Sequence, residues 1–91
     1  MTKRALTTQE SLRLDALVSH SGEVRHTYLL VRDDGSMMRH VRRDNDLQEL
    51  SLFGKRYQLA EGERMLLIEF NEHRAVLWEK TGPVARPYAS V

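Results

Sequence analysis

Two short stretches of the sequence hold the side chains with the clearest capacity for chemistry. They span residues 39–43 and 55–57, and their cationic and aromatic members are Arg39, His40, Arg42, Arg43, Lys55, Arg56 and Tyr57. Guanidinium groups bind phosphates through paired hydrogen bonds, and aromatic rings stack on unpaired bases. The set predicts a surface that binds DNA or RNA. In the alternative interpretation, the arginines lie on a solvated strand face and pair with Asp44, Asp46 and Glu49.

Other chemistries find little support in the residues. The chain has no cysteine, which excludes disulfides, thiolate metal sites and cysteine nucleophiles. The histidines have neither i, i+4 spacing nor cysteine partners, so a zinc site is not predicted; they are His20, His26, His40 and His73. The glycine-rich phosphate loops and the G-x-S-x-G motif of serine hydrolases are absent. We therefore expect a binding module without a cofactor, and not an enzyme.

Charge is nearly balanced over the chain but uneven along it. The formal net charge is +1. Residues 1–43 contain eight Lys/Arg and five Asp/Glu, whereas residues 44–79 contain four and eight. Domains that bind nucleic acid usually have a pI above ~9, and this chain has a pI of about 8.2. Nucleic-acid binding would therefore need a local basic patch, while the acidic stretch 61–79 could dock on a basic partner.

Length and hydropathy predict one domain away from membranes. Ninety-one residues suffice for one modest core. The longest apolar run is four residues, 65–68, far below the ~20 that span a bilayer. No charged-then-apolar leader opens the sequence. We expect a cytoplasmic single domain over residues 1–91, with flexible tails at residues 1–6 and 83–91.

The first half of the chain predicts a helix followed by a hairpin. Residues 7–21 begin with a capping box, although alternation between residues 12 and 18 also fits a strand. Helix is preferred because Gln, Glu, Leu, Arg and Ala favour it. Residues 24–32 and 36–43 are predicted strands joined at Asp34-Gly35. The two-residue loop would set Val31 opposite Met38 and Tyr28 opposite Val41, and one face would carry Arg39, Val41 and Arg43.

The second half predicts three further strands. Residues 47–59 alternate and bend at Gly54, residues 60–63 form a turn with Gly62 in the left-handed region, and residues 64–70 and 75–80 follow as strands. The predicted fold is α+β, mainly β: a short N-terminal helix and a five-stranded curled antiparallel sheet that closes as a small SH3-like barrel. Closure would bury Leu50, Leu52, Tyr57, Leu66, Ile68, Phe70, Val76 and Trp78.

Residues 39–83 carry a family resemblance. Arg42-Arg43 leads into the segment LSLFGKRY at residues 50–57, followed by GERMLLIEF at residues 62–70 and AVLW at residues 75–78. This pattern resembles the small C-terminal β-barrel of Mu-like and related DDE transposases. It departs from the family at Asn71-Glu72, where an Asp-Pro is frequent. The resemblance covers under half of the chain and includes no catalytic domain, so it implies an accessory module of a mobile genetic element that contacts nucleic acid or a partner subunit.

A second hypothesis concerns protein partners. Large apolar residues occupy both faces of the predicted strand 24–31, and the sheet would have exposed edges. These features are typical of a protein-interaction module: a homodimer, an adaptor or an inhibitor of a larger complex. It would use an exposed sheet edge or the acidic face.

Overall fold

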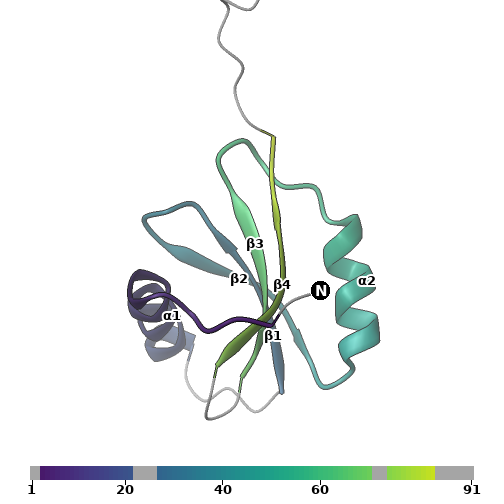
Figure 1. Cartoon of the computed structure of the whole chain (residues 1–91), viewed down its shortest axis with the longest axis horizontal. Helices are drawn as coiled ribbons and strands as arrows, with labels where there is room; N and C mark the ends of the chain where they lie inside the picture. Colours follow the sequence, from purple (N-terminus) through teal and green to yellow (C-terminus); the bar gives the residue numbers. More distant parts are fainter. Residues whose placement is uncertain (1–2, 22–26, 71–73, 84–91) are drawn as a thin grey trace, which may run out of the picture.

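The computed structural model describes residues 3–21, 27–70 and 74–83. The element order is α1 (Thr8–Ser21), β1 (Tyr28–Asp33), β2 (Met38–Asp44), α2 (Leu47–Arg56), β3 (Arg64–Glu69) and β4 (Ala75–Thr81). The strands form one antiparallel sheet in the order β2-β1-β3-β4. The two helices cover opposite faces of this sheet (Figure 1). The α+β class is confirmed.

The sheet corrects the predicted architecture in two respects. In the described part of the chain it has four strands instead of five, and it is open instead of closed into an SH3-like barrel, with β2 and β4 at its edges. The difference arises at the predicted strand 47–59, in which residues 47–56 form α2 and residues 57–59 belong to no strand. Asp46 caps this helix by accepting a hydrogen bond from the Glu49 amide at 3.2 Å. Leu52, predicted in the core, is 46% exposed.

The N-terminal helix is confirmed together with its capping box. Thr7 Oγ1 accepts a hydrogen bond from the Glu10 amide at 3.2 Å, and Glu10 Oε1 accepts one from the Thr7 amide at 2.9 Å. These reciprocal bonds satisfy two amides near the start of the helix. Leu14 is buried against the sheet, and Leu17 and Val18 pack beside it.

The β1–β2 hairpin exists, but its register differs from the predicted one. The loop contains four residues, because the Asp34 side chain accepts hydrogen bonds from the amides of residues 36 and 37, each at 2.9 Å. Asp33 therefore lies opposite Met38, and Val31 lies opposite His40. The predicted strand residues 24–26 lie outside the described part of the chain.

A bulge in β2 changes which arginine faces which helix. Val31 lies opposite His40 while Leu30 lies opposite Arg42, so Val41 is the extra residue. Arg43 lies opposite Leu29, which belongs to the core under α1. The expectation that Arg39, Val41 and Arg43 share a face is therefore wrong, and Arg42 takes the place of Arg43 on the side of α2.

The apolar core has two layers, one under each helix. The layer under α1 contains Leu14, Leu29, Val31, Met38, Leu66, Ile68 and Val76. The layer under α2 contains Leu30, Leu50, Met65, Leu67 and Trp78. Because β1 and β3 are central and covered on both faces, alternate residues of each strand enter different layers. The predicted core residues are buried or half-buried apart from Leu52.

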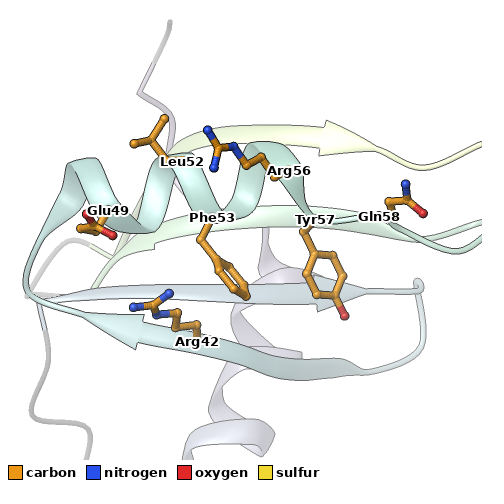
Figure 2. Close-up of a pocket in the computed structure, with 7 residues that line it drawn as sticks. All are labelled: Arg42, Glu49, Leu52, Phe53, Arg56, Tyr57 and Gln58. Carbon is orange, nitrogen blue, oxygen red and sulfur yellow. The ribbon is translucent and has the colours of Figure 1, made fainter.

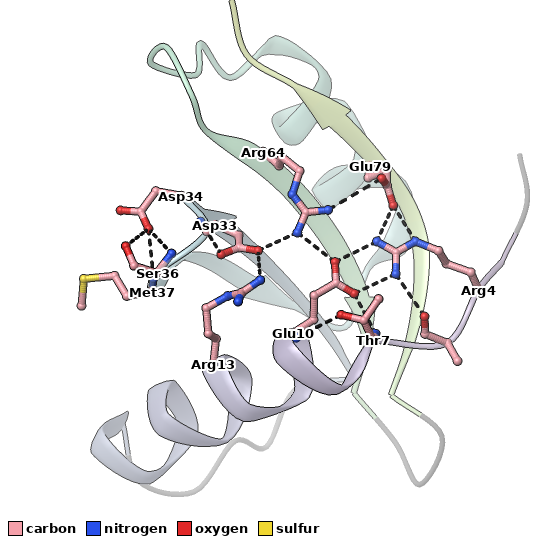
Figure 3. Close-up of polar contacts among 12 residues, drawn as sticks. Arg4, Thr7, Glu10, Arg13, Asp33, Asp34, Ser36, Met37, Arg64 and Glu79 are labelled. Atoms are coloured by element: carbon pink, nitrogen blue, oxygen red, sulfur yellow. Dashed lines mark hydrogen bonds and ion pairs between the residues drawn. The ribbon is translucent and has the colours of Figure 1, made fainter. Parts of the chain in front are cut away.

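A network of charged side chains holds the N-terminal segment and α1 against the sheet (Figure 3). Its carboxylates Glu10 and Asp33 are 2% and 0% exposed. Arg64 donates hydrogen bonds to both, at 2.9 and 2.6 Å. Arg4 makes a bidentate pair with Glu10 at 2.8 and 3.0 Å, and Arg13 binds Asp33 at 2.9 Å. The buried carboxylates are therefore paired from several elements, as burial of charge requires.

The same network covers part of the β4 edge. The Arg4 amide donates to the Val76 carbonyl at 3.0 Å, and the Val76 amide donates to the Arg4 carbonyl at 2.7 Å. The Arg4 guanidinium also contacts Glu79 at 2.6 Å. Arg4 belongs to the segment 1–6 for which we expected flexibility, and in the structure both its backbone and its side chain are bound. In the described part of the chain, no helix is both long enough and apolar enough to cross a bilayer.

Replacement of Gly54 should destabilise the fold even though alanine favours helix. A Cβ at this position would lie 2.7 Å from two ring carbons of Trp78 and 3.2 Å from a Leu30 methyl. The overlap should cost about 1–3 kcal/mol, more than the ~1 kcal/mol that Ala gains over Gly in a helix. We expect urea unfolding to show lower stability for Gly54→Ala and little change for the exposed control Gln48→Ala. A stabilised Gly54→Ala would contradict this packing.

Acid should weaken the fold partly through Glu10. The hydrogen bonds from Arg4 lower the pKa of Glu10 to about 2, against the opposing effect of burial. The pKa of Glu10 is lower in the folded chain than in the unfolded chain. The ionised Glu10 therefore contributes its full share of folding stability above about pH 4.5, and this share is lost as the pH falls toward about 2. Glu10→Gln should lower the free energy of unfolding by roughly 3 kcal/mol or more near pH 7. This loss should become smaller as the pH falls from about 4.5 toward about 2. Denaturant unfolding across this range, with the exposed Glu61→Gln as control, measures it; a cost independent of pH would contradict the assignment.

Candidate nucleic-acid interface

Both ends of helix α2 have polar partners, and the C-terminal end is bound to the sheet. Asp46 caps its start, and Lys80 of β4 donates hydrogen bonds near its end to the carbonyls of Lys55, at 3.3 Å, and Tyr57. The last carbonyls of a helix have no partners within it, and a cation is favourable there. The Asp46 cap therefore defines where the helix begins, and Lys80 connects its C-terminal end to β4.

Gly54 allows α2 to approach the sheet closely. The Trp78 ring occupies the space where a side chain would stand at position 54, and Trp78 Nε1 donates to Ser51 Oγ at 3.4 Å. Because of this close approach, the face of α2 that contains Gly54 also packs over β1 and β2. Phe53 and Tyr57, one helical turn apart, consequently extend toward β2.

A hollow of about 540 Å³ lies between α2 and β2. We call it the α2–β2 groove, and its lining residues are Arg42, Glu49, Leu52, Phe53, Arg56, Tyr57 and Gln58. Figure 2 shows Phe53 and Tyr57 directed from the helix toward the strands, with Arg42 approaching from β2. The Arg42 guanidinium lies 5.0 Å from the centre of the Phe53 ring. The centres of the Phe53 and Tyr57 rings are 6.1 Å apart.

The groove contains three of the seven predicted site residues: Arg42, Arg56 and Tyr57. Arg39 faces the same side of the sheet but pairs with Asp34 in the hairpin loop at 3.2 Å. Lys55 is exposed on α2 and is not among the lining residues. The predicted patch is therefore divided, and only part of it surrounds one concave surface.

His40 and Arg43 lie on the opposite face of the sheet. They are opposite Val31 and Leu29, whose side chains enter the layer under α1. Partial burial, together with the charge of Arg43, lowers the pKa of His40 below its usual value near 6.5. His40 is consequently neutral at pH 7 and does not add a positive charge.

The sequence prediction omitted Phe53, the ring that contacts Arg42. Phe53 precedes Tyr57 by four residues, and positions four apart share one side of a helix and also one face of a regular strand. In the predicted strand the bend at Gly54 lies between the two rings and would separate them. The i, i+4 aromatic spacing could have identified the pair if the segment had been taken as helical. Glu49 and Gln58 complete the lining and were also omitted as site residues.

Ion pairs change the apparent charge distribution along the chain. The acidic stretch 61–79 is paired with cations from residues 1–43: Glu69 with Lys3 at 3.0 Å, Glu63 with Arg32 at 3.2 Å, and Glu79 with Arg4 at 2.6 Å. By contrast, Arg43, Lys55 and Arg56 form no ion pair with any residue in the described ranges. Among the described residues, these three unpaired cations lie on β2 and α2, while three carboxylates of the acidic stretch are each paired.

The alternative interpretation, in which nearby carboxylates neutralise the arginines, holds for one pair. Arg42 contacts Asp44 at 3.5 Å. Asp46 instead caps α2, and no ion pair between Glu49 and a described residue is found. Within residues 3–21, 27–70 and 74–83, no group of three His, Asp or Glu side chains is placed to hold a metal ion.

Comparisons with protein-family models, curated proteins and solved structures give no match. The resemblance to the transposase β-barrel therefore stays a prediction. In the structure, the segment 50–57 that contributes to this resemblance lies mainly in α2.

Arg42 and Arg56 should be replaceable without loss of the fold. Both are outside the two core layers, and a solvent-exposed cation–π contact or surface ion pair contributes up to about 1 kcal/mol. We expect Arg42→Ala and Arg56→Ala to lower the unfolding free energy by less than ~1 kcal/mol. As a contrast, Trp78→Ala, which empties the space beside Gly54, should cost about 3–5 kcal/mol. A large reduction in stability in either arginine variant would show that the groove is part of the structural core.

Proposed function

We propose that this chain is a non-enzymatic module that binds single-stranded DNA or RNA in the α2–β2 groove. One observation carries the proposal: Arg42 and Arg56 flank the partly exposed rings of Phe53 and Tyr57 in a single hollow. Proteins that bind single strands combine a cationic groove with aromatic stacking surfaces.

The recessed position of the rings supports a single strand over a duplex. Phe53 and Tyr57 face into the groove and not outward from a convex surface. A base can reach their faces only when it is unpaired, whereas bases of a duplex are stacked on one another. The two guanidinium groups would contact the adjacent phosphates.

The surrounding charges support the same ligand. Arg43 and Lys55 lie outside the groove and would add long-range attraction for a polyanion. Glu49 lies at the end of the lining away from Tyr57 and Gln58 (Figure 2), where its carboxylate would repel phosphate. The phosphates would therefore pass nearer to Arg42 and Arg56, and Glu49→Gln should strengthen binding.

The sequence resemblance favours a particular setting for this activity. An accessory β-rich module of a mobile genetic element that contacts nucleic acid accords with the resemblance of residues 39–83 to the transposase domain. Such a module would act in the cytoplasm. The genes adjacent to the one that encodes this chain test that setting.

Oligonucleotide binding tests the proposed function directly. Fluorescence anisotropy of labelled oligo-dT and oligo-U should show binding at about 50 mM salt that weakens steeply at about 200 mM. Tyr57→Leu removes a stacking surface worth about 1–3 kcal/mol, so affinity should fall roughly fivefold or more. Arg42→Ala and Arg56→Ala should weaken binding and flatten its salt dependence by about 0.7 in log–log slope for each phosphate that the variant no longer binds.

Arg74→Ala is the matched control for Arg42→Ala. The Arg74 guanidinium lies 5.1 Å from the Phe70 ring and pairs with Asp15 of α1, just as Arg42 lies over Phe53 and pairs with Asp44. Both changes remove the same charge and the same kind of contact, but Arg74 is on the α1 side. Equal reductions in affinity in the two variants, or no binding by the parent chain at about 50 mM salt, would refute the proposal.

A further inference from the structure

The two edges of the sheet are unequally covered. The edge of β4 pairs with the backbone of Arg4 at Val76. The outer edge of β2 pairs with no residue in the described part of the chain. Unpaired amides and carbonyls along an edge strand can accept another strand.

A hollow flanks β2 on each face of the sheet. On one face is the α2–β2 groove, which Arg42 lines. On the other face is a hollow of about 310 Å³ between α1 and the hairpin, which we call the apolar hollow. Its lining is Leu12, Arg13, Ala16, Leu17, Ser36, Met37 and Met38. Leu12 and Met37 are 59% and 49% exposed, so the apolar hollow is open to an incoming side chain.

The existing β1–β2 pairing defines the spacing that a new strand would need. In β1, Asp33 lies opposite Met38 and Leu30 lies opposite Arg42. These two β1 residues are three positions apart and face opposite sides of the sheet. On the same spacing, a strand added outside β2 would direct one side chain toward the apolar hollow and another, three residues away, toward Arg42.

Charge determines the class of this strand. The described part of β2 carries Arg39, Arg42 and Arg43. A second copy of β2 would bring these arginines opposite one another, which is unfavourable. We propose that the outer edge of β2 accepts an extended acidic segment of a partner protein as a fifth strand. One aliphatic side chain enters the apolar hollow, and one carboxylate pairs with Arg42.

This inference does not depend on the proposed nucleic-acid function. It rests on the unpaired β2 edge and the apolar hollow, neither of which a nucleic acid would use. Arg42 is common to both ligands, so the acidic segment would displace an oligonucleotide from the α2–β2 groove. A partner that carries such a segment would thereby regulate binding of nucleic acid.

Two synthetic peptides of identical composition test the geometry. Each is a blocked, labelled, threonine-rich peptide with one leucine and one glutamate. In the first these residues are three positions apart and face opposite sides; in the control they are two apart and share a face. We expect the first peptide to bind about fivefold tighter or more, because only it can occupy both hollows. Exchange-protected β2 amides, measured by NMR, should accompany its binding.

Protein variants test the contribution of each hollow to peptide binding separately. Leu12→Ser and Met37→Ser change exposed side chains and should each weaken the first peptide by about fivefold or more, since the leucine would then bury less apolar surface. Arg42→Ala should also weaken it, and Arg74→Ala should not. Equal affinity for the two peptides, no effect of Leu12→Ser, or unchanged β2 amide exchange would overturn the inference.

The remaining outcomes distinguish this inference from the proposed function. Oligonucleotide binding without peptide binding overturns the β2-edge inference alone. Peptide binding without oligonucleotide binding overturns the proposed function alone. Light scattering that shows dimers in which β2 amides become protected would identify a second copy as the occupant and would overturn the acidic-segment proposal.

Discussion

Arg64 holds two buried carboxylates at once, and the rest of the fold depends on that contact. Glu10 comes from α1 and Asp33 from the end of β1, and neither is more than 2% exposed. Removal of the arginine would leave two negative charges in a nearly dry environment, which is strongly unfavourable. The network therefore specifies where α1 lies on the sheet, in addition to what apolar packing contributes. It also fixes which sheet face stays available to α2.

The fold near β3 and β4 follows closely from sequence, and the fold near α2 does not. The β3 and β4 strands have strong apolar patterns, and Gly62, with φ of 82°, occupies the left-handed turn position as expected. Residues 47–56 support both alternation and helical spacing. The outcome depends on Trp78, which comes 24 positions after Gly54 and packs where a side chain would stand. A local pattern cannot contain that tertiary contact.

The candidate site was predictable in composition and not in arrangement. The cations and Tyr57 were identified from residue type, but the hairpin register decided which of them meet. The Asp34 side chain lengthens the loop to four residues, and the bulge at Val41 then exchanges the sides of Arg42 and Arg43. The ion pairs of the acidic stretch were not predictable either, because the cations that bind Glu63, Glu69 and Glu79 come from residues 1–43 and only the folded chain brings them together.

The bulge at Val41 interrupts the alternation of side chains between the two faces of β2. Compared with a regular strand of the same sequence, the residues before Val41 face the same side of the sheet, and the residues after it face the opposite side. If the same sequence paired with β1 without the bulge, Val41 would lie opposite Leu30, Arg42 opposite Leu29 on the α1 side, and Arg43 opposite Tyr28 on the α2 side. The side chains that reach the α2–β2 groove are therefore determined by whether one residue of β2 is left out of the ladder, with no change in the sequence of the strand.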